Sequence, residues 1–348
     1  MSAETLTPEL VNRVARYTTE RDMEAEDWEK AVALNGLVAT EKATYVDAAR
    51  SLVDRSIATQ TSAGQLTYGS LDYKPWIDRT ELSSFKGQSD PAAVGHAVLD
   101  FYRKTDEAEY RDAARRQFEF FDDVERTEEG GIPHIRERTE LWVDAIYMVC
   151  PFFARYGELV DEAGFDEAVQ QIRLQSKYLQ DPHTGLFRHA WRECPNMYPS
   201  STFWSRGNGW AAAGMLDTLE LLPEDHEGRA DIESAFRELA AAALELQDDS
   251  GYWHHIIDDR TTPLEASGTL MFSYAFKRAY DAGVLEDEAY ATAARRGIDI
   301  CCGVVDEDGA VHRISEPPGG ERMPLGVTSY GQGWFLLAAS QFEDGKLA

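Results

Sequence analysis

The feature that most constrains the fold of this chain is a short loop that recurs five times. Each copy has an acidic or polar turn, then Gly, then an apolar residue, often followed by His or Tyr. The repeated glycines are Gly64, Gly131, Gly185, Gly251 and Gly309, at spacings of 67, 54, 66 and 58 residues. Such a recurrence indicates a chain built from repeated supersecondary units.

Between these loops, apolar residues recur with the spacing of amphipathic helices. Short and long connections alternate, and the long ones run to roughly 15–30 residues. Pro91 after Asp90, and Ser267 before an apolar run, are helix-start signals. The predicted helices span residues 7–21, 28–40, 42–58, 91–104, 107–124, 140–157, 161–180, 205–221, 227–247, 267–282, 286–303 and 329–342.

Six helical hairpins joined by five similar loops predict a closed (α/α)6 barrel, all-α and a single domain over residues 1–348. The first and last helices would pair to complete the sixth hairpin. A linear helical solenoid is the alternative, but irregular spacing and the lack of capping units argue against it. In a barrel the five long loops share one rim. Five helix N-termini point at that rim, and their free N–H groups suit a carboxylate or phosphate.

The charge of the chain excludes several kinds of partner. It has 62 acidic and 34 basic residues, a net charge of −28, and only 8 of the basic residues are Lys. A dispersed, Lys-poor acidic surface suits a salt-rich cytoplasm that screens self-repulsion, although a surface for a basic partner is the alternative. We expect no binding to nucleic acid or anionic membranes.

Targeting and cofactor signals are missing from the sequence. The N-terminus lacks a signal-peptide pattern and no apolar run reaches eighteen residues, so we expect a cytoplasmic protein without a membrane span. The four Cys form no CxxC pair, and no HExxH, GxGxxG, P-loop or GxSxG motif occurs. No metal or cofactor is therefore expected.

Two aspartates stand at predicted rim positions. Asp144 lies in an otherwise apolar helix start, so it is either a helix stabiliser or a proton donor whose pKa is raised by burial. Asp90 occupies the matching place before the helix at 91–104. It is either the second member of a carboxylate pair or an ordinary N-cap before Pro91.

Aromatic and basic residues gather at the same rim. In residues 203–210, two glycines beside Arg206 and between Trp204 and Trp210 suit backbone approach to a ligand, sugar stacking and a carboxylate clamp. His134 and His189 lie in the repeated loops, where they could also be structural. Residues 265–269 and 329–334 fit close helix packing through small residues, or substrate contact by Tyr330 or Trp334.

Taken together, these segments resemble glycoside hydrolase family 105, the unsaturated rhamnogalacturonyl hydrolases, and the related family 88. The resemblance spans about residues 25–340. The matching segments are Asp90–Leu99 with Tyr102, Leu141–Asp144 through Phe152, Trp204–Trp210, Glu265–Thr269 with Phe272, and Tyr330–Gly333. It implies a hydrolase that acts on the 4,5-unsaturated uronic acid left at the non-reducing end by polysaccharide lyases. Hydration of the double bond gives a hemiketal that opens and expels the neighbouring sugar.

By this resemblance Asp144 protonates C4 and then serves as base for the water that adds at C5, and Asp90 is its neighbour and holds sugar hydroxyls. Arg206 and the helix N-termini would favour the uronate carboxylate. The residues expected to bind substrate are His189, Trp142, Trp204, Arg206, Trp210 and His134, the last standing where some relatives have Lys.

Several points remain open at the level of sequence. Lys30 stands where an aromatic residue is common, so Trp28 and Lys30 are not assigned to the site. The sugar that follows the uronate is not fixed, and glucuronate-containing substrates are an alternative. Other functions on the same barrel are a conventional glycosidase, an epimerase using His189 and His254, and a non-catalytic sugar-binding protein.

Overall fold

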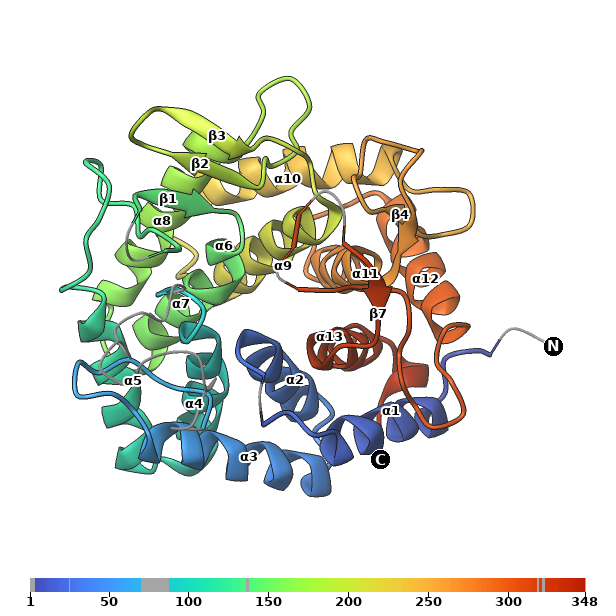
Figure 1. Ribbon diagram of the computed structural model, residues 1–348, viewed down its shortest axis with the longest axis horizontal. Coiled ribbons are helices and arrows are strands. Elements are labelled where there is room, and N and C mark those ends of the chain that lie inside the picture. Colours follow the sequence, from blue (N-terminus) through green and yellow to red (C-terminus); the bar gives the residue numbers. More distant parts are fainter. Residues whose placement is uncertain are drawn as a thin grey trace.

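The helices form two concentric rings (Figure 1) in the computed structural model, which describes residues 4–24, 26–69, 88–135, 138–317, 319–320 and 323–347. The inner ring comprises α2 (Trp28–Ala39), α4 (Ala92–Thr105), α7 (Cys150–Leu159), α9 (Ser205–Leu221), α11 (Ala266–Asp281) and α13 (Ser329–Ala339). The outer ring comprises α1 (Pro8–Glu20), α3 (Ala43–Ala58), α5 (Ala108–Phe120), α8 (Ala163–Leu179), α10 (Arg229–Glu245) and α12 (Glu288–Cys302).

Each inner helix contacts the next one around the ring, and α13 contacts α2. The ring is therefore closed, which confirms the (α/α)6 barrel and contradicts the open solenoid. Helix α1 packs on α13 and completes the sixth hairpin, as the sequence predicted.

The inner helices are apolar nearly all round because neighbours enclose every face of them. Every residue of α13 is buried. At the seam between α2 and α13, a Cβ on Gly36 would lie 2.5 Å from the carbonyl oxygen of Gly333. Only glycine allows the two backbones to approach so closely.

The repeated loops lead from the outer helix of one hairpin to the inner helix of the next, and their turns pack against the outer helix of that next hairpin. Their glycines have positive φ, and a Cβ on Gly185 would meet the Glu238 carbonyl of α10 at 2.7 Å. In the last copy a Cβ on Gly309 would lie 2.4 Å from the Arg13 carbonyl of α1, so this loop joins the end of the chain to its beginning.

One assignment within the repeat was wrong. In the second copy the residue with positive φ is Gly130 (φ 94°), and its N–H donates to the Thr127 carbonyl; Gly131 is not the equivalent residue. Matching turns make the same bond to the residue three positions back, for example from Gly251 N–H to the Asp248 carbonyl. Two adjacent glycines satisfy the sequence pattern equally, and only the turn geometry separates them.

The predicted helix at 140–157 was also wrong in its extent. Residues Glu140–Trp142 form strand β1, α6 covers only Ala145–Met148, and α7 begins at Cys150. Pro151 has no N–H to donate to the Tyr147 carbonyl, so a continuous helix would lose that bond and gain a steric clash. Upstream, β1 pairs with β2 (Ala190–Arg192), with Trp142 opposite Ala190.

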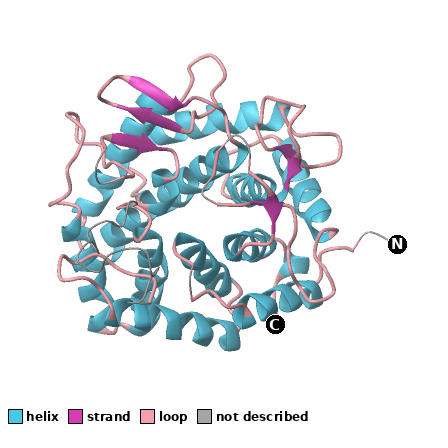
Figure 2. Cartoon of the chain, viewed as in Figure 1, coloured by secondary structure: helices cyan, strands magenta, loops and turns pink. Residues whose placement is uncertain are grey.

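Short strands in the long loops are the other departure from the purely helical prediction (Figure 2). The sheet that contains β1 and β2 is completed by β3 (Met197–Ser200). Two further pairs join β4 (Trp253–His254) with β5 (Leu264–Glu265), and β6 (Ile314–Ser315) with β7 (Leu325–Gly326). A 3-10 helix, η2 (Glu343–Gly345), follows α13. No helix among the described residues is long and apolar enough to cross a bilayer.

The ring contact at Gly309 can be tested by substitution. We expect Gly309→Ala to lower the free energy of unfolding by roughly 3 kcal/mol, because it combines positive φ with a clash against α1. Gly283→Ala is the matched control, since Gly283 also has positive φ (72°) but nothing lies within 4 Å of its Cβ position. That control should lose only about 1 kcal/mol. Equal losses in denaturant unfolding would contradict the proposed ring contact.

Candidate active site

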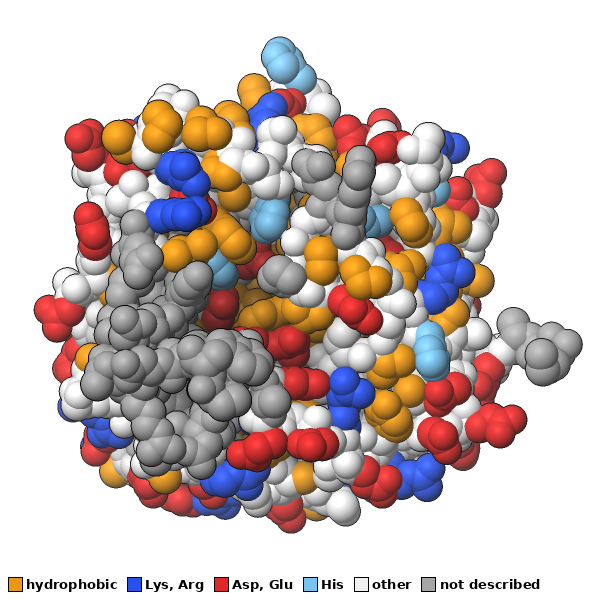
Figure 3. All heavy atoms as spheres, in the orientation of Figure 1, with side chains coloured by type: hydrophobic (Ala, Val, Ile, Leu, Met, Phe, Trp, Pro, Cys, Tyr) orange, Lys and Arg blue, Asp and Glu red, His pale blue; other side chains and the backbone are white. Residues whose placement is uncertain are grey.

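The rim that carries the long loops is hollowed near its centre, where hydrophobic, acidic and histidine side chains meet (Figure 3). Predicted site residues from separate loops meet there through ring contacts. The rings of His134 and Trp142 stack in parallel with centroids 4.3 Å apart, and Trp142 meets His189 edge-on at 5.1 Å. The next ring contact, between His189 and Trp204, is 4.9 Å. The site is therefore a continuous wall of aromatic and imidazole rings.

Each predicted aspartate lies beside one of these imidazoles. The Oδ2 atom of Asp144 is 3.6 Å from Nε2 of His189, and Oδ1 of Asp90 is 3.6 Å from Nδ1 of His134. Ser89 Oγ also lies 2.8 Å from His134 Nδ1. Two carboxylate–imidazole pairs thus flank Trp142.

Neither aspartate serves as a helix cap. Asp144 occupies the N-cap position of α6, but its side chain makes no capping bond, and its Oδ2 is buried without a hydrogen-bond partner among the described residues. Asp90 precedes the actual N-cap of α4, which is Pro91. Neither aspartate side chain therefore makes a capping hydrogen bond. An unsatisfied buried carboxylate oxygen is typical of a functional site.

Burial changes the protonation of the site. It raises the pKa of Asp90 to about 6; the His134 charge opposes this shift, and Asp144 and Asp27 add to it. Burial also lowers the pKa of His189, with Asp144 acting in the opposite direction. His189 is therefore neutral at neutral pH, while Asp90 keeps a substantial protonated fraction near pH 6.

The orientation of the Trp142 ring is set by buried polar contacts. Its indole N–H donates to Glu140 Oε2 at 3.0 Å, and Arg192 Nε donates to the other oxygen of Glu140 at 2.6 Å. This arrangement exists because residues 140–142 form a strand and not the start of a helix.

Arg206 lies beneath the site and has no exposed surface. Its guanidinium stacks 4.1 Å from the Trp204 ring and 4.9 Å from the Tyr330 ring, and its Nη1 donates to the Ser315 carbonyl and the Tyr330 hydroxyl. In this arrangement it fixes the two aromatic rings that border the site.

Trp210 is placed deeper than the sequence suggested. It is fully buried in the inner ring, with its ring 4.9 Å from Tyr147 and 5.5 Å from Trp334. Ring and ion-pair contacts thus group Asp90, His134, Trp142, Asp144, His189 and Trp204. Trp204, like Arg206 and Trp210, has no exposed surface.

Other parts of the rim motifs are structural. The Asn208 side chain accepts from the Phe187 N–H at 2.7 Å and donates to the Phe187 carbonyl at 2.9 Å, which fixes the loop that carries His189. Glu265 caps α11 by accepting from the N–H groups of Ser267 and Gly268. Both side chains therefore hold segments of the rim in place: Asn208 the loop that carries His189, and Glu265 the start of α11.

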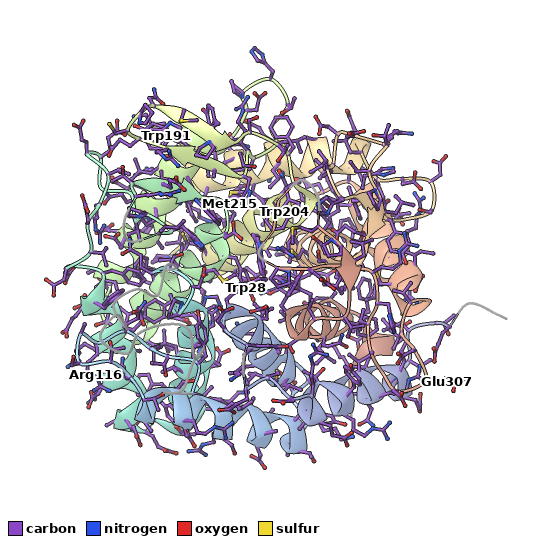
Figure 4. All side chains as sticks on the ribbon, viewed as in Figure 1. Trp28, Arg116, Trp191, Trp204, Met215 and Glu307 are labelled. Atoms are coloured by element: carbon purple, nitrogen blue, oxygen red, sulfur yellow. The ribbon has the colours of Figure 1, made fainter. Side chains whose placement is uncertain are left out.

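Sequence reasoning missed the start of α2. The Trp28 ring lies 4.8 Å from Tyr330 and faces the Arg206 guanidinium at 5.5 Å, and Figure 4 places it near the barrel axis with Trp204. Lys30 instead donates to the Tyr68 carbonyl at 3.0 Å. No repeated loop precedes α2, so the pattern that marked the other rim positions gave no signal here.

Glu29 adds a further carboxyl group at this helix start. Burial and a hydrogen bond to Asp27 raise its pKa to about 9. It is therefore protonated at neutral pH. Among the described residues, no group of three His, Cys, Asp or Glu side chains could hold a metal ion.

The comparisons with known proteins agree with this geometry. Residues 3–344 match Glycosyl Hydrolase Family 88, so the protein is a glycoside hydrolase. The chain belongs to glycoside hydrolase family 88. This confirms the resemblance to the family 105 and family 88 hydrolases that the sequence suggested.

Two curated relatives are similar to the chain. It is 27% identical over 318 residues to the unsaturated rhamnogalacturonyl hydrolase YesR of Bacillus subtilis, covering 88% of this chain and 83% of that protein. It is also 26% identical over 214 residues to an unsaturated 3S-rhamnoglycuronyl hydrolase of Formosa agariphila, covering 58% of this chain and 56% of that protein.

Solved structures share the fold. A possible family 105 member from Salmonella enterica superposes with a TM-score of 0.81 at 23% identity, over 96% of this chain and 92% of that one. The unsaturated glucuronyl hydrolase of Bacillus sp. GL1 superposes with a TM-score of 0.71 at 14% identity, over 95% of both chains.

The raised pKa of Asp90 predicts a pH-dependent stability difference. A carboxyl group with a pKa of about 6 in the folded state and 3.8 otherwise favours folding below pH 3.8, and this contribution is lost as pH rises through 6. Asp90→Asn cannot ionise. Relative to wild type it should therefore gain roughly 2 kcal/mol in unfolding free energy between pH 4.5 and 7.5. Exposed Asp123→Asn is the control and should show no such gain; a pH-independent difference for Asp90→Asn would refute the assignment.

Proposed function

We propose that this hydrolase removes a 4,5-unsaturated uronic acid from the non-reducing end of lyase-generated oligosaccharides by hydrating the C4=C5 bond. The observation that carries the proposal is the Asp144 carboxylate, buried with an unsatisfied oxygen beside neutral His189 in an aromatic-walled site. The names of the relatives, rhamnogalacturonyl and rhamnoglycuronyl hydrolases, support the same substrate class.

In this mechanism Asp144 donates a proton to C4 of the unsaturated ring. The ionised carboxylate then takes a proton from the water that adds at C5, so the acid is regenerated in each turnover. The resulting hemiketal opens and releases the neighbouring sugar. Neutral His189, 3.6 Å from the carboxylate, supplies a polar partner without a positive charge that would hold the carboxylate ionised.

Asp90 and the stacked rings would hold the substrate. A carboxyl group with a pKa of about 6 both donates and accepts hydrogen bonds near neutrality, which suits sugar hydroxyls. The partly exposed Trp142 ring, held parallel to His134, offers a flat face for a sugar ring. The N-termini of the inner helices, together with Arg206 behind Trp204, would attract the uronate carboxylate.

The rival functions find less support. The epimerase alternative needs His254 as a partner of His189 at the reacting carbon. Instead, Nδ1 of His254 lies 2.7 Å from the Thr262 carbonyl and its Nε2 lies 3.7 Å from Asp248, so both ring nitrogens face its own loop. A binding protein would need the aromatic rings, but not a buried carboxylate with an open oxygen.

An unsaturated rhamnogalacturonan disaccharide from pectin is our proposed substrate, because the relative that covers most of the chain is named for that activity. Glucuronate-derived substrates are the alternative, since a structural neighbour is named an unsaturated glucuronyl hydrolase.

The first test follows the ultraviolet absorbance of the unsaturated uronate group in this disaccharide, together with rhamnose release. Wild-type enzyme should abolish the absorbance as rhamnose appears. Asp144→Asn should lower kcat by at least about 100-fold while substrate still binds, because the amide cannot transfer the proton. Asp123→Asn, on the exposed surface, should leave kcat unchanged.

Other outcomes would point elsewhere. Cleavage of a saturated glycoside at constant absorbance would assign a conventional glycosidase. Binding without turnover in the wild type, unchanged by Asp144→Asn, would assign a sugar-binding protein.

We also propose that the enzyme works in a salt-rich cytoplasm, which the net charge of −28 supports. Raising NaCl from about 0.1 M to about 1 M shortens the Debye length from about 10 Å to 3 Å and so weakens self-repulsion. We therefore expect the thermal unfolding midpoint and kcat to rise over this range. Full stability and activity at 0.1 M would contradict salt adaptation.

A further inference from the structure

A cavity of about 590 Å³ opens at the end of the barrel opposite the candidate active site. The inner helices begin at the candidate active-site rim, and C-terminal parts of several of them line this cavity, for example Arg103 of α4 and Arg278 of α11. Tyr147, on the short helix that follows Asp144, contributes to its wall. A volume of this size accommodates a monosaccharide-sized ligand.

The charge of the cavity wall differs from that of the protein. Across the chain, acidic residues outnumber basic ones by 62 to 34. In the cavity the ratio is reversed, with five basic and three acidic lining residues: Arg103, Lys104, Arg155, Arg278 and Lys346 against Glu41, Asp100 and Asp217. His96 adds no positive charge, because burial and the nearby Arg155 hold its pKa well below the ordinary value.

The acids deeper in this wall already have partners within it. Asp217 accepts from the Tyr274 hydroxyl at 2.7 Å and from Arg278 Nη1 at 2.8 Å. Asp100 accepts from Arg155 Nε at 3.4 Å. Arg103, Arg278 and Lys346 also pair with glutamates beside the cavity, namely Glu158, Glu220 and Glu343. Arg155 and Lys104 are therefore the basic lining residues that keep donors for a ligand.

Two basic side chains retain unused donors. Arg155 Nη1 is buried and has no hydrogen-bond partner in the described part of the chain, and leaving such a donor unpaired is destabilising. Lys104 is exposed and makes no ion pair or hydrogen bond with a described residue. Both belong to the wall of the same cavity.

Stabilisation of helix C-termini explains the presence of some of these basic residues, but not that of Arg155. Arg103, Lys104 and Arg278 lie in the last turns of α4 and α11, where basic residues stabilise the C-terminal carbonyls. Arg155 lies before the last turn of α7, and its side chain is still 19% exposed toward solvent. A forked guanidinium in this position suits an oxyanion with two oxygens to share.

We propose that this cavity is a second binding site, for a small ligand that carries one carboxylate or phosphate group. Arg155 and Lys104 contact the anionic group. Tyr147 and Asn35, whose Oδ1 is buried without a partner among the described residues, contact the rest of the ligand. The site does not depend on the function proposed above.

Isothermal titration calorimetry at one fixed NaCl concentration tests this site, with inorganic phosphate, galacturonate and galactose as probes. Galactose is the neutral match of galacturonate. We expect saturable binding of at least one of the two anions and at least tenfold weaker binding of galactose. Binding of phosphate alone identifies a phosphorylated ligand, and binding of galacturonate alone identifies a sugar acid.

Variants assign the binding to the cavity. Arg155→Met should weaken binding at least about tenfold, whereas Arg103→Met, whose side chain pairs with Glu158 at the surface, should change it less than threefold. Lys104→Ala, at an exposed position, should weaken binding about threefold and provides the test if Arg155→Met does not fold. His189→Ala, at the active-site rim, should bind as the wild type does.

Three results would overturn the proposal. The first is no binding of either anion. The second is equal binding of galactose and galacturonate. The third is binding that survives Arg155→Met and Lys104→Ala but is lost in His189→Ala, which would place the ligand in the active site.

Discussion

The closure of the inner ring is the constraint on which the rest of this structure depends. The two ends of the ring meet at α2 and α13, where Gly36 and Gly333 allow the backbones to touch. In the outer ring, the loop that contains Gly309 makes a similarly close contact with the backbone of α1. A closed ring leaves no terminal hairpin exposed, and it forces all inner helices to present their first turns to one end. The candidate active site lies at that end, and the second cavity lies at the other.

The interruption before α7 positions the chemistry. Pro151 accounts for the break between α6 and α7, and upstream of α6 Glu140–Trp142 pairs with the strand that follows His189. This pairing brings His189 beside Asp144 and orients Trp142 between the two carboxylate–imidazole pairs. In a continuous helix Trp142 and Asp144 would both lie on the helix surface. No strand would then be available to pair with the strand that follows His189.

The chain as a whole is strongly charged, whereas burial at the rim favours the neutral forms of the titratable groups there. The surface carries a large negative charge, which screening by salt makes tolerable. Inside the rim, burial moves Asp90 and Glu29 toward their neutral forms and keeps His189 neutral. Burial at the rim therefore opposes the charge of these three groups, whereas the chain as a whole is strongly acidic.

Helical periodicity and the repeated turn are local properties, and the sequence by itself therefore determined the six hairpins, the shared rim and the candidate residues Asp90, Asp144, His134, His189 and Trp204. Turn chemistry is read over a few residues, and helix periodicity over a few turns. Only the tertiary structure decided that Gly130 and not Gly131 is the repeated glycine, that Trp28 joins the site, and that Arg206 and Trp210 lie behind it. It also decided which carboxylate meets which imidazole, and that Arg155 faces a second cavity. These facts depend on how closely segments far apart in the chain approach one another, and no local pattern records that distance.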